Sequence, residues 1–169
     1  MDAIEVSGRR FGLTADTHDD KVDWPKVMAG LTAAWGYVDG ILHCGDVTSR
    51  AALESLGKVA PVYATRSSGD PQPEPPRLND GPRVLTLGGA RVGLTFELAE
   101  ADRTADALTR LFDGPVAACV FGGTHEASIE NAGGVLLVNP GSPSLAKTRT
   151  CAVLTVENGR PSAAIVEIG

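Results

Sequence analysis

Two aspartates and two histidines each stand where an apolar segment of the chain gives way to a loop: Asp16, His18, Asp46 and His125. Carboxylate oxygens and imidazole nitrogens form a ligand set that can hold a divalent first-row metal and still leave room for water or substrate. In open α/β sheets such residues meet beyond the carboxyl ends of parallel strands. The spacing therefore predicts a metal site assembled from three separate strands.

The first half of the chain supplies the elements that must position these residues. Apolar side chains recur at three- and four-residue spacing in one segment, and short apolar runs separate the helical patterns. The predicted strands span 10–16, 40–46 and 61–66, and the predicted helices span 24–38 and 49–57. This βαβαβ order, with continuously apolar strands, predicts a parallel sheet covered on both faces.

The second half of the chain predicts mainly antiparallel pairing. Residues 67–83 contain five prolines and are expected to form an irregular surface loop. Further expected elements are a hairpin of 83–87 and 91–96, a helix at about 102–112 with Asp102 as its N-cap, strands at 115–121 and 134–140, and a final hairpin turning at Asn158-Gly159. Together these elements indicate one α/β sandwich domain spanning residues 1–169.

Composition narrows the function class. The net charge of −6 argues against a nucleic-acid binder, which normally carries a basic face. The three cysteines, at positions 44, 119 and 151, have no CxxC spacing and are typical of reduced thiols in a cytoplasmic protein. No apolar stretch approaches the ~20 residues of a membrane span, and the N-terminus shows no secretory signal.

With these motifs the sequence resembles the calcineurin-like metallophosphoesterases, in particular their small single-domain phosphodiesterases and the retromer subunit of that fold. The resemblance rests on FGLTADTH for the Asp-x-His motif, LHCGDV for Gly-Asp, FGGTH for Gly-His-Thr-His and VNPGSPS for the closing Asn-Pro-Gly-Ser. VYATRSSGD stands where the family has Gly-Asn-(Cys/His)-Asp, and VGLTFE stands where it has a strand ending in His-Gly. The resemblance implies a four-layer αββα sandwich, in which two sheets are flanked by helices.

The family builds two adjacent metal sites, about 3.5–4 Å apart, which together clamp a phosphate. Carried over by position, the resemblance implies a complete first site here: Asp16, His18, His125 and the bridging Asp46. The second site lacks its other ligands, because Ser68 replaces the asparagine and Phe96 and Gly123 replace two histidines. One divalent metal per chain is expected, and Mn²⁺, Zn²⁺, Fe²⁺ and Ni²⁺ are not distinguished.

A rebuilt second site is an alternative, because Asp70 and Glu97 flank the emptied positions and could supply oxygen ligands. Gly69 stands where much of the family has a histidine proton donor. The resemblance thus implies weak hydrolysis, by metal-bound water, of a phosphomonoester or phosphodiester small molecule or nucleotide. Asp46 and His125 are the expected catalytic positions. The rival interpretation is a non-catalytic binding or scaffold protein with a protein partner or a second copy of itself.

Simpler roles stay open for some of these residues and their neighbours. Asp16 and His18 could cap the following helix instead of binding a metal. His43, inside a predicted strand, is expected to be a buried histidine with its hydrogen bonds satisfied. The NPGS segment at 139–142 is expected to be a turn that supports His125.

Overall fold

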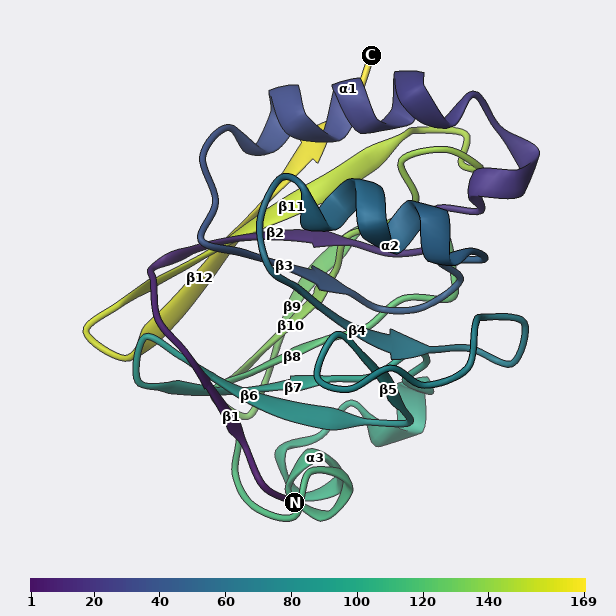
Figure 1. Cartoon of the computed structure of the whole chain (residues 1–169). Helices are drawn as coiled ribbons and strands as arrows, with labels where there is room; N and C mark the ends of the chain where they lie inside the picture. Colours follow the sequence, from purple (N-terminus) through teal and green to yellow (C-terminus); the bar gives the residue numbers. More distant parts are fainter.

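Two six-stranded sheets pack face to face in the computed structural model, which describes residues 1–169 (Figure 1). The first, called here the β3 sheet, has the strand order β12-β11-β2-β3-β4-β5. Its strands are β2 (Arg10–Thr14), β3 (Gly40–His43), β4 (Val62–Arg66), β5 (Leu78–Asp80), β11 (Thr150–Glu157) and β12 (Arg160–Glu167). The strands β2, β3 and β4 are parallel, as predicted. β5 extends this parallel sheet beside β4, and β11 and β12 add an antiparallel hairpin on the β2 side.

The second sheet, called the β7 sheet, has the order β1-β6-β7-β8-β10-β9. Its strands are β1 (Ile4–Val6), β6 (Arg83–Leu87), β7 (Ala90–Leu94), β8 (Ala118–Val120), β9 (Ser128–Ala132) and β10 (Val135–Asn139). β6 and β7 form the expected hairpin, whereas β8 runs parallel to both of its neighbours, β7 and β10.

Three helices cover the outer faces of the two sheets. α1 (Trp24–Trp35) and α2 (Arg50–Gly57) lie on the β3 sheet, and α3 (Ala105–Leu111) lies on the β7 sheet (Figure 1). α1 buries one stripe of side chains, Val27, Leu31 and Trp35, which follows from their three- and four-residue spacing. The expected four-layer αββα sandwich is thus confirmed. None of the helices has the length and apolar character of a membrane span.

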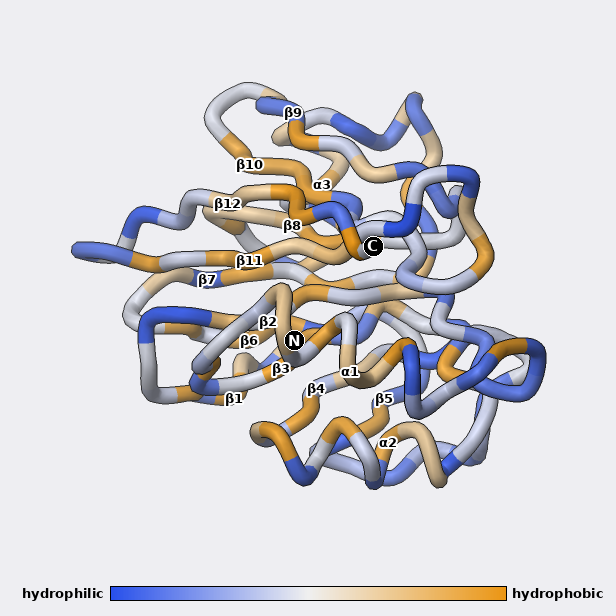
Figure 2. Tube along the Cα trace, turned by 90° about the horizontal axis from the view of Figure 1, so that it is seen from above, coloured by the Kyte–Doolittle hydropathy of each residue, from blue (hydrophilic) through white to orange (hydrophobic).

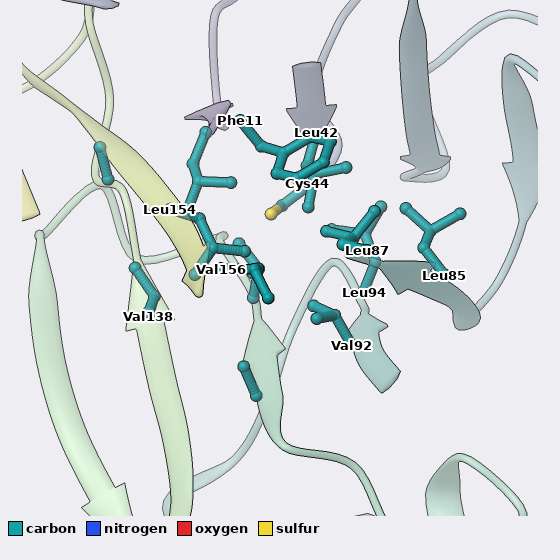
Figure 3. Packing of buried hydrophobic residues seen from close by; sticks show 14 of the residues in the cluster. Phe11, Leu42, Cys44, Leu85, Leu87, Val92, Leu94, Val138, Leu154 and Val156 are labelled. Carbon is teal, nitrogen blue, oxygen red and sulfur yellow. The ribbon is translucent and has the colours of Figure 1, made fainter. Parts of the chain in front are cut away.

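The main core lies between the sheets. Phe11, Leu42 and Cys44 from the β3 sheet meet Leu85 and Leu94 from the β7 sheet (Figure 3). A second cluster joins α1 and α2 to the β3 sheet, and a third joins α3 to the β7 sheet. Hydrophobic residues concentrate along the strands, while the connecting loops are largely hydrophilic (Figure 2). All three cysteines are buried and unpaired.

Several expected elements differ in the structure. The proline-rich segment 67–83 contains β5, whose fully buried Leu78 closes the parallel sheet beside β4. A single buried leucine among prolines gives no period that would predict a strand. The pairing of the second half is mainly antiparallel, as expected, but β8 is parallel to both of its neighbours, which the chain reaches through crossovers whose direction depends on long-range packing. β1 and β9 were not predicted: β1 is only three residues long, and β9 is largely exposed.

Two helix boundaries also need correction. α1 ends at Trp35 rather than at residue 38, because Gly36 takes a positive φ of 63°. α3 is capped by Thr104, whose hydroxyl accepts the Ala107 N–H at 3.2 Å, and not by Asp102. Asp102 instead ends the short 3₁₀ turn Glu100–Asp102. Both threonine and aspartate are good N-caps, so composition alone does not choose between them.

Gly12→Ala is expected to destabilise the protein by about 2 kcal/mol, the usual cost of overpacking a core. A Cβ at Gly12 would lie 2.6 Å from the ring of Trp35, which is fully buried and donates its indole N–H to Ala152 O at 3.1 Å. Gly57→Ala is the matched control, because nothing lies within 4 Å of a Cβ there, and it should stabilise α2 by about 0.5–1 kcal/mol. Urea unfolding of both variants measures the difference. Equal stability of Gly12→Ala and the wild type would contradict the described packing of α1 on β2.

Candidate metal centre

The four predicted ligands converge at one end of the sheets. Ligand atoms of Asp16, His18, Asp46 and His125 all lie within 4.8 Å of one another. Asp16 and His18 follow β2, Asp46 follows β3, and His125 follows β8. Beyond the strands the Asp16 N–H donates to Gly45 O at 2.9 Å and the His18 N–H donates to Asp46 O at 3.1 Å. These bonds hold the loops after β2 and β3 together, so the carboxylates and imidazoles face a common point.

All four residues have a left-handed backbone, with φ of 52° at Asp16, 42° at His18, 56° at Asp46 and 63° at His125. Positive φ is uncommon outside glycine, although aspartate and histidine tolerate it better than most residues. The whole chain has only seven such non-glycine positions, so the cluster holds more than half of them. Strained conformations of this kind persist where the surrounding structure fixes them, and they gather at functional sites.

Asp16 is the most buried member of the cluster, with a side chain that is 0% exposed. Its Oδ2 accepts the Gly123 N–H at 3.0 Å, while its Oδ1 has no hydrogen-bond partner and lies 3.7 Å from His125 Nε2. Burial raises the pKa of the Asp16 carboxyl to about 7, and the charge of Asp46 adds to this, whereas the Gly123 N–H and His125 act to lower it. A buried carboxylate with one open oxygen is stabilised by a cation.

Each of the two histidines turns its Nε2 atom toward the other ligand atoms of the cluster. His125 Nδ1 lies 3.0 Å from Leu145 O, and because a carbonyl only accepts, Nδ1 carries the proton and Nε2 is left as a free ligand atom. His18 Nε2 is buried without a hydrogen-bond partner, 3.4 Å from Asp46 Oδ2. Buried polar atoms without partners are rare in proteins. The two here, Asp16 Oδ1 and His18 Nε2, fit a divalent cation between them.

Asp46 is held by a residue that the sequence did not indicate. The Ser67 hydroxyl donates to Asp46 Oδ1, and Ser67 Oγ accepts the Asp46 N–H at 3.3 Å. Ser67 is 7% exposed, whereas the neighbouring Ser68 points to solvent.

The predicted second-site positions lie outside the four-residue cluster. The Phe96 ring packs on Gly45, where a Cβ would come within 2.5 Å of it, and so fills space beside Asp46. Both carboxylate oxygens of Asp70 accept backbone N–H groups, from Thr48 and Ser67, each at 2.9 Å. Glu97 is exposed and its side chain lies against Gly123.

Local contacts and backbone conformation explain why residues 122 and 123 are both glycine. A Cβ at Gly122 would lie 2.7 Å from Ala15 Cβ, so only glycine lets this loop approach the loop after β2. Gly123 has φ of 89° and its N–H binds Asp16. Gly123 thus offers no side chain to the cluster, while its backbone N–H holds the Asp16 carboxylate in place.

His43 supports the loops as a neutral histidine. Its Nδ1 accepts the Gly45 N–H at 3.1 Å, so Nε2 carries the proton and donates it to Thr17 Oγ1 at 2.9 Å. Burial lowers the pKa of His43 to about 4. Both ring nitrogens are thus satisfied, as expected for a strand histidine.

The NPGS segment supports the same loops from the other side. The Ser142 hydroxyl donates to Asp16 O at 2.8 Å, and the Ser144 hydroxyl donates to Thr17 O at 2.7 Å. Asn139 Nδ2 donates to Thr124 Oγ1 at 3.0 Å, next to His125. Residues 139–144 thus bind the backbone of the loop after β2 and the Thr124 side chain in the loop after β8.

Comparison with known proteins agrees with this geometry. A probable metallophosphoesterase of Methanocaldococcus jannaschii is 30% identical over 139 residues, which cover 80% of this chain and 68% of that protein. A novel archaeal phosphodiesterase has a similar structure, with a TM-score of 0.72 and 20% identity over 93% of this chain and 99% of that one. Vps29 of Entamoeba histolytica, in complex with Zn²⁺, gives a TM-score of 0.71 and 18% identity over 95% of this chain and 99% of that one.

The comparisons also fix the family. Residues 10–159 match the calcineurin-like phosphoesterase superfamily domain, a range that contains all four residues of the cluster and ten of the strands. The match, the two-sheet sandwich and the convergent carboxylates and imidazoles point in the same direction. The chain belongs to the calcineurin-like phosphoesterase superfamily.

Proposed function

We propose that the chain binds one divalent metal ion at Asp16, His18, Asp46 and His125 and hydrolyses a phosphoester slowly. The observation that carries the proposal is the pair of buried atoms without partners, Asp16 Oδ1 and His18 Nε2, inside a set of four ligand atoms. The Zn²⁺ complex of the similar E. histolytica protein supports a metal in this fold. A divalent cation held there would polarise a phosphoryl oxygen and lower the pKa of a coordinated water.

The residues of the chain would orient and hold the reacting groups. The Leu145 carbonyl fixes the tautomer and direction of His125, and the Ser67 hydroxyl holds the Asp46 carboxylate. Asp16 and Asp46 place negative charge where the phosphate would approach, so substrate binding depends on the cation. Gly69 offers no proton to a leaving group, which limits the rate.

Metal stoichiometry is proposed to be one per chain rather than two. Ser68 points to solvent, Phe96 covers Gly45, and position 123 has no side chain. Asp70 already satisfies two backbone N–H groups, which argues against its use as a substitute ligand. We propose a phosphomonoester, phosphodiester or nucleotide as the substrate class and the cytoplasm as the location.

Metal content and hydrolysis together test the proposal. Protein purified without chelator and reloaded with Mn²⁺ should retain about one ion per chain and hydrolyse bis-p-nitrophenyl phosphate, and EDTA should abolish the activity. Two retained ions would contradict the single site. No retained ion would overturn the proposal altogether.

A scaffold role is the second candidate, favoured by the apolar Phe96 ring beside Asp46. It predicts one retained ion without turnover of any phosphoester tested, and partner binding that survives Asp46→Asn. Loss of a chelator-sensitive hydrolysis in Asp46→Asn would count against it.

A further inference from the structure

A cavity of about 400 Å³ lies between the start of α1 and the loop 143–149. It is separate from the cluster of ligand atoms, none of which lines it. Its lining residues are Lys21, Val22, Asp23, Lys26, Val27, Pro143, Ser144, Leu145, Arg149, Ile168 and Gly169. Three of these side chains are cationic and only one is acidic, in a chain whose net charge is −6.

The three cations have no partners in the folded chain. Lys21, Lys26 and Arg149 take part in none of the ion pairs, and their side chains make no hydrogen bonds to other residues. Asp23 is engaged elsewhere, because its Oδ1 accepts the Lys26 backbone N–H at 3.3 Å as the N-cap of α1. The three side chains are exposed, so their charges are available to an anion in the cavity.

The cavity shares a wall with the candidate metal centre. Ser144 and Leu145 line it, and the same residues bind Thr17 O through the Ser144 hydroxyl and His125 Nδ1 through the Leu145 carbonyl. The Lys21 N–H also donates to His18 O at 3.0 Å. A ligand in the cavity therefore contacts the segments that position His18 and His125.

We propose that Lys21, Lys26 and Arg149 form a binding site for a phosphate group, adjacent to the metal centre. The phosphate belongs either to a distal part of the substrate that the metal centre holds or to a separate effector molecule. The site itself does not depend on the proposed hydrolysis, because its cations bind the anion directly.

The test uses the full-length protein without metal, in EDTA, where Asp16 and Asp46 repel anions from the metal centre. Titration calorimetry with inorganic phosphate and with pyrophosphate should show saturable binding to one site. The double variant Lys26→Gln/Arg149→Gln should weaken the affinity at least tenfold. Lys58→Gln, an exposed lysine at the end of α2, should leave it unchanged. No saturable binding, equal binding by the double variant, or an equal loss in Lys58→Gln would overturn the proposal.

Binding of inorganic triphosphate to the Mn²⁺-loaded protein distinguishes a distal phosphate of the substrate from the phosphate of a separate effector. A distal substrate group predicts one bound molecule whose affinity falls in both His125→Ala and Lys26→Gln/Arg149→Gln. A separate effector predicts two molecules, each sensitive to only one of these variants. If the protein retains no Mn²⁺, the proposed function is contradicted. The phosphate titration of the metal-free protein still shows whether the cavity binds phosphate.

Discussion

His125→Ala is expected to reduce the affinity for Mn²⁺ at least ~100-fold, more than is typical for loss of a residue that only orients a ligand. The variant removes one of four ligand atoms and leaves Asp16 Oδ1, which lies 3.7 Å from His125 Nε2, with one neighbour fewer. His125 is 34% exposed, so the fold should tolerate the truncation. Competition of the wild type and the variant against a fluorescent chelator measures the difference.

Glu126→Ala is the matched control for this experiment. Glu126 is the next residue in the chain, its side chain is exposed, and its N–H rather than its carboxylate binds Thr124 Oγ1. It should bind Mn²⁺ with the affinity of the wild type. Equal affinities of all three proteins would show that His125 is not a ligand.

Asp16→Asn is expected to stabilise the metal-free protein while it weakens metal binding. At pH 8 the buried Asp16 carboxylate is charged with one open oxygen, whereas asparagine is neutral and places an N–H₂ donor toward His125 Nε2. The pKa of Asp16 is about 7 in the folded chain and 3.8 in the unfolded chain. One pKa unit corresponds to about 1.4 kcal/mol, so the gain at pH 8 is on the order of 4 kcal/mol.

The pH dependence identifies the cause of this gain. As pH rises from about 4 to about 7, the unfolded chain releases the Asp16 proton before the folded chain does, so the stability of the metal-free wild type falls relative to the variant. His43, with its lowered pKa of about 4, acts in the opposite direction, but it is present in both proteins and cancels in the difference.

Urea unfolding in EDTA at pH 4, 6 and 8 measures the stability difference between the wild type and Asp16→Asn. The difference should be largest at pH 8 and near zero at pH 4. Excess Mn²⁺ at pH 8 should reverse the order, because only the wild type gains the free energy of tight metal binding. A difference that does not change with pH would show that burial of the Asp16 charge is not the cause.

The parallel part of the β3 sheet and its helices could be predicted from the sequence because their signals are local. Continuous apolar runs mark β2, β3 and β4, and the spacing of Val27, Leu31 and Trp35 marks α1. β5 and the parallel placement of β8 could not be predicted. A three-residue strand leaves almost no pattern, and the direction of a strand depends on which neighbour the chain reaches after a crossover.

Only part of the candidate site could likewise be predicted from the sequence. Residue types and their positions after strands were enough to select the four residues of the cluster. Ser67 was missed because its contact with Asp46 depends on how two loops meet, and serine carries no signal of its own. The cationic cavity was missed for a similar reason, because Lys26 and Arg149 are more than one hundred residues apart in the chain.

The sequence by itself therefore determined the family, the order of the first elements and the four residues that could hold a metal. The tertiary structure decided which of their atoms are free. In the folded chain the Gly123 N–H donates to one oxygen of Asp16, and the other oxygen has no partner. The Leu145 carbonyl binds His125 Nδ1, so that His125 Nε2 faces this open oxygen. The sequence supplies the types of ligand atom. An open coordination position arises only when distant loops form hydrogen bonds with some polar atoms and leave others without a partner.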